Sequence, residues 1–129
     1  EFEKEVVLAK WCELTGDATQ RSQHFEEAAR LKPEDPYIAF ETAAALRLCG
    51  RTEAAIREFQ RLVSLDPTEV TGYVQLAGIY ESQKDFQSLA SILETIFEIE
   101  PELQSDRKTK KLYKKACKKS GHDGKFLNP

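Results

Sequence analysis

Apolar residues recur along this chain at spacings of three and four, in stretches that are separated by short polar segments. One such stretch contains Ala55, Ile56, Phe59 and Leu62. This spacing places the apolar side chains on a single face of an α-helix, which can then pack against a neighbour. Read along the chain, the pattern predicts six helices, near residues 3–15, 18–31, 36–48, 52–65, 70–82 and 86–99.

Three prolines set the register of these predicted helices. Pro33, Pro67 and Pro101 each follow the end of an apolar stretch, and they are separated by 34 residues, twice. A proline lacks an N–H group and disfavours helical geometry at the residue before it, so each helix should end just upstream. A constant period of this length is typical of stacked helix-turn-helix repeats.

A break between two predicted helices lies near the middle of each period. Gly16, Gly50 and Lys84 occupy equivalent places there, and each begins a short polar segment between two apolar stretches. Glycine adopts the left-handed conformation that ends a helix and lets the chain reverse direction. The pattern therefore predicts three pairs of antiparallel helices, over residues 2–35, 36–69 and 70–103.

At this level of detail the chain resembles the tetratricopeptide repeat, whose signature is an aromatic, Leu-Gly and Tyr, followed by Ala, Phe and Pro. The residues that carry the resemblance are Leu8, Ala9, Gly16, Phe25, Ala28 and Pro33 in the first repeat, Ala43, Leu46, Gly50, Ala55, Phe59 and Pro67 in the second, and Tyr73, Leu76, Ala77, Tyr80, Leu93 and Pro101 in the third. The chain departs from the pattern at four positions. Arg21 and Leu89 replace a small residue at the helix crossing, and Glu5 and Ala39 replace an aromatic.

The segment after the third repeat predicts one more amphipathic helix. Thr109, Leu112, Tyr113, Ala116 and Cys117 form an apolar stripe, and eight Lys or Arg side chains fill the other positions of residues 107–119. A solenoid leaves the flank of its last repeat exposed, and a helix that is polar on its outer face covers it. We therefore expect a capping helix near 104–119, completing an all-α domain over residues 1–121, and a flexible tail over 122–129. The resemblance implies that the α-solenoid coils as a right-handed superhelix.

Composition narrows the class of protein. Hydrophobic residues make up 40% of the chain and charged residues 32%, and no run of about 20 apolar residues exists, so we expect no membrane span. The three cysteines lie far apart and form no metal-binding or disulfide pattern. Reduced thiols favour a cytoplasmic protein, or a cytosol-facing fragment of a larger one. Of the 22 acidic residues, 21 precede residue 107, so an acidic body carries a basic end.

The resemblance also implies where a partner binds, because the first helix of each pair lines a concave groove in such repeats. The corresponding positions are Val6, Lys10, Tyr37, Phe40, Ala44, Arg47, Thr71, Val74, Gly78 and Glu81, with Lys108, Leu112 and Lys115 closing one end. Large apolar groups on an exposed wall favour a partner that covers them. Lys10 and Arg47 are candidate anchors for carboxylates. The alternative for Tyr37 and Phe40 is that they pack between repeats.

One class of ligand is disfavoured. Family members that hold a chaperone's C-terminal carboxylate resemble one another in a clamp of Lys, Asn, Asn, Lys and Arg. The matching positions here are Val6, Lys10, Glu41, Thr71 and Gln75, and none carries the expected residue. We therefore expect no carboxylate-clamp chaperone tail among the partners.

Nothing in the sequence indicates catalysis. His24 and His122 belong to no nucleophile relay or metal site, and the glycines form no phosphate-binding loop. We expect no enzyme activity, no cofactor, no metal and no small-molecule substrate.

The sequence thus predicts a module that binds a protein or peptide partner in its groove, as an adaptor or scaffold. Two alternatives stay open. The chain is a structural segment of a longer solenoid or a self-associating scaffold, in which its acidic body and basic end meet between copies. Alternatively, an anionic partner or RNA binds the basic patch, formed by Lys110, Lys111, Lys114 and Lys118.

Overall fold

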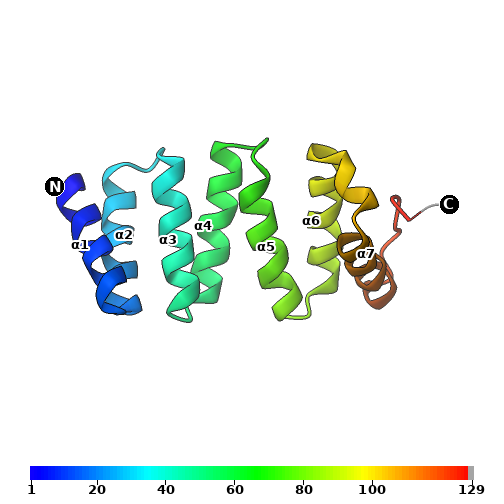
Figure 1. Cartoon of the computed structure of the whole chain (residues 1–129), viewed down its shortest axis with the longest axis horizontal. Coiled ribbons are helices and arrows are strands. Elements are labelled where there is room, and N and C mark those ends of the chain that lie inside the picture. Colours follow the sequence, from blue (N-terminus) through cyan, green and yellow to red (C-terminus); the bar gives the residue numbers. More distant parts are fainter. Residues whose placement is uncertain (128–129) are drawn as a thin grey trace. The chain divides into compact units, whose positions relative to one another are not determined.

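The computed structural model describes residues 1–127, and most of them lie in helices (Figure 1). The first three helices are α1 (Phe2–Thr15), α2 (Ala18–Leu31) and α3 (Pro36–Leu48). They are followed by α4 (Thr52–Leu65), α5 (Val70–Ser82) and α6 (Phe86–Ile99). A short 3₁₀ helix, η1 (Pro101–Ser105), then leads into α7 (Arg107–Ser120). The six predicted repeat helices are confirmed, most of them to the residue.

The three prolines act as the sequence predicts. The residues before them, Lys32, Asp66 and Glu100, share one extended conformation, with φ between −127° and −143° and ψ between 76° and 80°. Each helix ends there because the following proline cannot tolerate helical geometry at the residue before it. The period of 34 residues is therefore visible in the backbone as well as in the sequence.

The predicted chain reversals are equally regular. Gly16 and Gly50 have φ of 80° and 88°, and Lys84 takes the same left-handed region at 58°. Asp17 and Asp85 follow two of these residues and accept a hydrogen bond from the backbone N–H of Gln20 and Ser88, so they start the next helix.

The chain divides into two compact units, residues 1–67 and the residues from 68 onward. The first unit contains α1 to α4. Its core includes a cluster of Ala9, Phe25 and Ala45, and a second cluster in which Ile38 packs on the alanines of α2. Thr42 is buried and donates a hydrogen bond to the Phe25 carbonyl at 3.1 Å, which joins α3 to α2.

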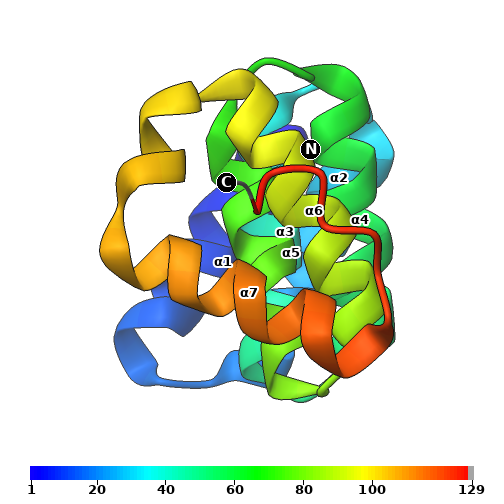
Figure 2. The same cartoon turned by 90° about the vertical axis from the view of Figure 1, so that its right-hand side faces the viewer.

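The second unit contains α5, α6, η1 and α7. In Figure 2, α7 lies across α6. Three residues of its apolar stripe are buried. Tyr113, Ala116 and Cys117 are buried in one cluster with Leu93 and Phe97 of α6. This agrees with the capping role that the sequence predicts for the last helix.

The segment after α7 has partners that its sequence pattern did not reveal. We expect a flexible tail over residues 122–129, and residues 128–129 lie outside the described part. The Phe126 ring packs edge-on against Phe97, with ring centroids 5.4 Å apart, and the Phe126 N–H donates to the Tyr113 hydroxyl at 3.3 Å. Residues 122–127 therefore add an aromatic ring to the core of the second unit.

Candidate functional site

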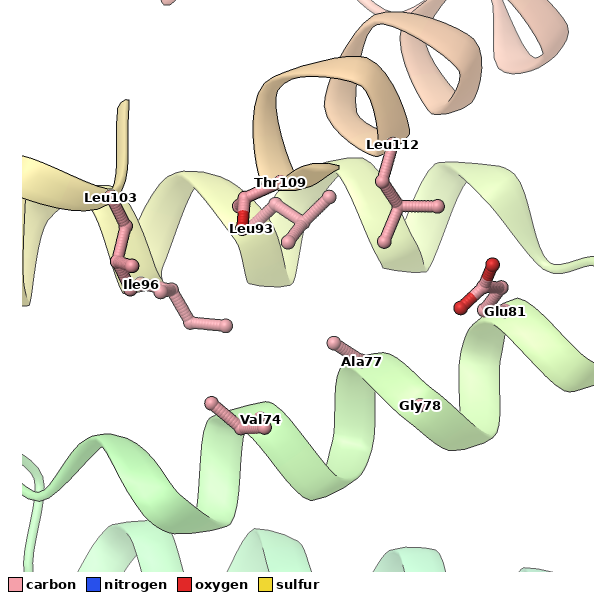
Figure 3. Close-up of a pocket in the computed structure, with 9 residues that line it drawn as sticks. All are labelled: Val74, Ala77, Gly78, Glu81, Leu93, Ile96, Leu103, Thr109 and Leu112. Carbon is pink, nitrogen blue, oxygen red and sulfur yellow. The ribbon is translucent and has the colours of Figure 1, made fainter. Parts of the chain in front are cut away.

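The second unit contains an apolar groove with a volume of about 260 Å³ (Figure 3). One wall is α5 and the opposite wall is formed by α6, η1 and α7. The residues that line the groove are Val74, Ala77, Gly78, Glu81, Leu93, Ile96, Leu103, Thr109 and Leu112.

The spacing of α5 explains how it builds one wall. Val74, Gly78 and Glu81 follow one another at intervals of four and three, so they lie on the same side of the helix. Val74 is 46% exposed although it is apolar. Gly78 has no side chain, and the wall at this point is backbone. A bound chain can therefore approach α5 closely next to an apolar contact.

The groove has an acidic end. Glu81 is the only charged residue in its lining, and Figure 3 shows the carboxylate at the end of the wall away from Leu103. Within residues 1–127 no hydrogen bond or ion pair to this carboxylate is formed. Because the rest of the lining is almost entirely apolar, Glu81 favours a cation on any partner that fills the groove.

Some of the residues that the sequence suggests for partner binding lie in this lining. They are Val74, Gly78 and Glu81 on α5, with Leu112 on α7, and their role in binding stays a prediction. Thr71 is exposed on α5 outside the groove, where its hydroxyl donates to Glu69 at 2.8 Å.

The lysines expected at the end of the groove lie outside its lining. Lys108 is exposed, and Lys115 Nζ lies 5.7 Å from the ring centre of Phe86. Sequence reasoning missed Leu103 on η1, where no helical period exists to indicate it. Thr109 also lines the groove. Its place in the apolar stripe of α7 is the sequence feature that could have indicated this.

The predicted groove residues of the first unit gather around a charge cluster. Lys10 Nζ lies 3.2 Å from Glu41 Oε2, and Arg21 Nη2 lies 3.8 Å from the same oxygen. Lys10 Nζ also lies 5.4 Å from the ring centre of Tyr37, which is 52% exposed. Hydrogen bonds with Tyr37 and with Glu41 raise the pKa of Lys10.

This cluster changes the role expected for Lys10. A partner's carboxylate would compete there with Glu41, which already neutralises the ammonium group. Arg21 is buried in the same cluster, where it also approaches Glu13 Oε2 at 3.8 Å. The sequence departure at this position is therefore accommodated by two acidic neighbours.

The remaining predicted residues of the first unit are less available. Val6 is half-buried and packs on the cluster around Ile38. Phe40 is also half-buried and meets Phe59 edge-on, with ring centroids 6.0 Å apart, so it packs within its own helix pair. Ala44 and Arg47 are half-buried on α3. Among the candidate groove residues of this unit, Tyr37 is the one large apolar side chain that is mostly exposed.

The basic patch lies on the outer face of α7. Lys111, Lys114 and Lys118 surround a shallow hollow of about 650 Å³ together with Lys115 and Lys119, and Lys110 is exposed beside them. Aromatic side chains are absent from the lining of this hollow. The patch offers charge without a surface on which a base could stack.

Comparison with known proteins identifies the fold. No protein-family model matches the chain. The TPR2B domain of yeast Sti1, in its complex with pHsp70, matches with a TM-score of 0.71 at 22% identity, over 92% of this chain and 97% of that one. MamA matches with a TM-score of 0.76 at 16% identity, over 98% and 72%.

A third match is the Yersinia enterocolitica type III secretion chaperone SycD in complex with a peptide of the translocator YopD. Its TM-score is 0.73 at 16% identity, over 91% of this chain and 92% of that one. At such identities the likeness concerns the fold alone. It confirms the all-α, tetratricopeptide-repeat-like domain that the sequence predicts. In the described part of the chain, no helix has the length and apolar character needed to cross a membrane.

Proposed function

We propose that this chain is a non-enzymatic protein-interaction module that holds a peptide segment of a partner in the groove between α5 and α7. The observation that carries the proposal is the apolar lining around Val74 and Gly78, open to solvent in a helix that is otherwise well packed. When a partner removes apolar surface of this kind from water, the free energy of the complex decreases, so binding is favoured.

Matched proteins of the same fold support a role in binding. The Sti1 domain is in a complex with pHsp70, and SycD is in a complex with a YopD peptide. These complexes support our proposal that this chain acts as an adaptor or scaffold. The fold likeness supports binding as a class of function, and the partner's chemistry has to come from this chain's own groove.

The groove favours a partner with a bulky apolar residue next to a basic one. Its volume of about 260 Å³ suits one or two apolar side chains, and Glu81 lies at its end without an ion-pair partner in the described part of the chain. A C-terminal carboxylate is a poor ligand for this site because it would face Glu81. In the first unit, Lys10 already forms an ion pair with Glu41, so a ligand's carboxylate would have to compete for it. We infer that carboxylate-clamp chaperone tails are not the partners.

We propose no catalytic step, cofactor or metal for either unit. His24 Nδ1 lies 2.7 Å from Glu5 Oε1, and His122 Nε2 lies 2.9 Å from Glu94 Oε2. Each histidine thus contacts a carboxylate on another segment of the same unit. Neither histidine lines the groove. The three free thiols are consistent with the cytoplasmic location that we propose.

Selection from a random peptide library on the immobilised full chain tests the proposal. We expect enriched peptides to share a bulky apolar residue beside Lys or Arg. Val74→Lys should abolish their binding, and Glu81→Gln should weaken it and reduce its dependence on salt. Leu48→Lys is the matched control, because Leu48 is 69% exposed in the other unit and should retain binding.

Circular dichroism establishes that the variants are folded. Enriched peptides that bind Val74→Lys as well as the unmodified chain would place the site elsewhere. A selection that enriches acidic peptides, with binding lost on charge reversal of Lys111 and Lys114, would favour the basic patch over the groove.

A further inference from the structure

Helix α1 exposes an apolar stripe that no part of the described chain covers. Val7, Trp11 and Leu14 are 66%, 64% and 81% exposed, and their spacing of four and three places them on one face of the helix. Trp11 is the only tryptophan of the protein. The stripe is distinct from the groove of the second unit, since it lies in the first.

The internal repeat shows what this face does elsewhere in the chain. Steps of 34 residues lead from Trp11 to Ala45, Ile79 and Tyr113, and all three are buried, with at most 1% of each exposed. Ala45 belongs to the cluster that contains Phe25 of α2. The Tyr113 ring packs edge-on against Phe97 of α6, at 5.3 Å between ring centroids and 82° between planes.

In the two cases where the contact lies within one unit, this position therefore meets the second helix of the preceding pair. Tyr113 is the closer template for Trp11, because both are large aromatic residues with one polar atom. The counterparts of Leu14 differ from one another, because Ala116 is fully buried whereas Leu48 is 69% exposed and Ser82 is exposed. Trp11 is thus the residue of the stripe that has the register of a side chain packed on a helix of the α6 type.

The size of the stripe favours a covalently attached occupant. A face of a 14-residue helix is about 20 Å long and about 10 Å wide, or roughly 200 Å². A stable interface between separate chains needs about 800 Å² from each partner. A helix in the same polypeptide needs less area, because the linkage raises its effective concentration.

We propose that the face of α1 centred on Trp11 is the docking surface for the second helix of another helix pair, joined in the same polypeptide ahead of α1. Trp11 packs on that helix as Tyr113 packs on α6. The partner presents an apolar or aromatic residue in the place of Phe97.

A fusion that carries the chain's own third repeat, residues 70–103, directly ahead of Phe2 tests this proposal. The 34-residue period then places Trp11 over the added copy of Phe97, in the register of Tyr113. Tryptophan fluorescence reports on Trp11 alone. We expect its emission to shift to shorter wavelength and its quenching by iodide to decrease relative to the unfused chain.

The matched control is the same fusion with Phe97→Lys in the added copy only, and its emission should return toward that of the unfused chain. A second fusion, with residues 36–69 ahead of Phe2, offers α4 in the same register. The proposal is wrong if neither fusion gains helicity by circular dichroism. It is also wrong if a fusion gains helicity but iodide quenches Trp11 in it as strongly as in the unfused chain. A shift of the unfused chain's emission that depends on concentration, with a doubled mass in sedimentation, would identify a second copy as the occupant and also overturn it.

Discussion

Replacing Tyr113 by phenylalanine isolates the hydrogen bonds that join the capping helix to the rest of the second unit. The Tyr113 hydroxyl donates to Glu94 Oε2 at 2.6 Å and accepts from the Phe126 N–H at 3.3 Å. The ring itself packs on Phe97 and Phe126, with centroids 5.3 and 6.3 Å away. Phenylalanine preserves this ring packing, so the substitution removes the hydroxyl group and little else.

The expected loss follows from the environment of that hydroxyl. Tyr113 is 1% exposed, and the Glu94 side chain is 14% exposed. A hydrogen bond to a charged group contributes about 1.5–3 kcal/mol, and an amide left without its acceptor adds to the loss. We expect Tyr113→Phe to lower the free energy of unfolding by about 2 kcal/mol at neutral pH. In a domain of this size that corresponds to a decrease in melting temperature of roughly 6–10 °C.

Urea unfolding followed by far-ultraviolet circular dichroism measures this loss, with an unchanged m-value as the sign that the unfolded state is unaltered. Tyr80→Phe is the matched control. Tyr80 is half-buried in the same unit, and its hydroxyl forms no hydrogen bond within residues 1–127. A Tyr113→Phe midpoint equal to that of the unmodified protein would show that the hydroxyl network does not hold the capping helix.

The stability difference between the unmodified protein and Tyr113→Phe should depend on pH. Burial, and then the hydrogen bond to Glu94, raise the pKa of Tyr113 above its ordinary value of about 10. Above that pH the unfolded chain loses the proton while the folded chain retains it, so the stability of the unmodified protein falls as pH rises. The stability advantage over Tyr113→Phe should therefore be complete below about pH 10 and decrease above it.

Three further substitutions test the repeat geometry, each by thermal and urea unfolding. Lys84→Gly should stabilise the fold by about 0.5–1 kcal/mol, because Lys84 holds the left-handed conformation that Gly50 holds one period earlier; equal stability would show that the lysine is not strained. Asp35→Ala should cost about 1 kcal/mol by removing the cap on the Tyr37 N–H at 3.0 Å, and a neutral result would contradict the cap. Phe97→Ala should cost about 3–5 kcal/mol, since Phe97 is 2% exposed, and a loss below 1 kcal/mol would contradict its place in the core.

Local features of the sequence were sufficient to predict the helices. Pro33, Pro67 and Pro101 determine where three helices end, and the residue before each proline takes the same conformation. Gly16 and Gly50 mark the reversals through their own backbone freedom. These effects act within one or two residues, so their period carries directly into the structure.

Features that depend on contacts between distant residues were predicted less well. Leu103 lines the groove from a 3₁₀ helix that has no apolar period, and Phe126 joins the core from a segment with none. Lys10 pairs with Glu41, which lies 31 residues further along the chain. Periodicity reports which face of a helix is buried, but it does not report which charged side chains meet across two helices.

This last difference bears directly on the chemistry of the partner. From the sequence, Lys10 is a candidate anchor for carboxylates, and Glu81 is a groove position whose ion-pair partners are unknown. In the structure Glu41 neutralises Lys10, and Arg21 approaches the same carboxylate. Glu81 lies at the end of an apolar groove and has no ion-pair partner within residues 1–127. A ligand gains most from a charge that folding has left unpaired, because it does not have to displace an existing partner. The charge preference that we propose for the groove therefore follows from Glu81, and we expect a basic partner segment to bind there in preference to an acidic one.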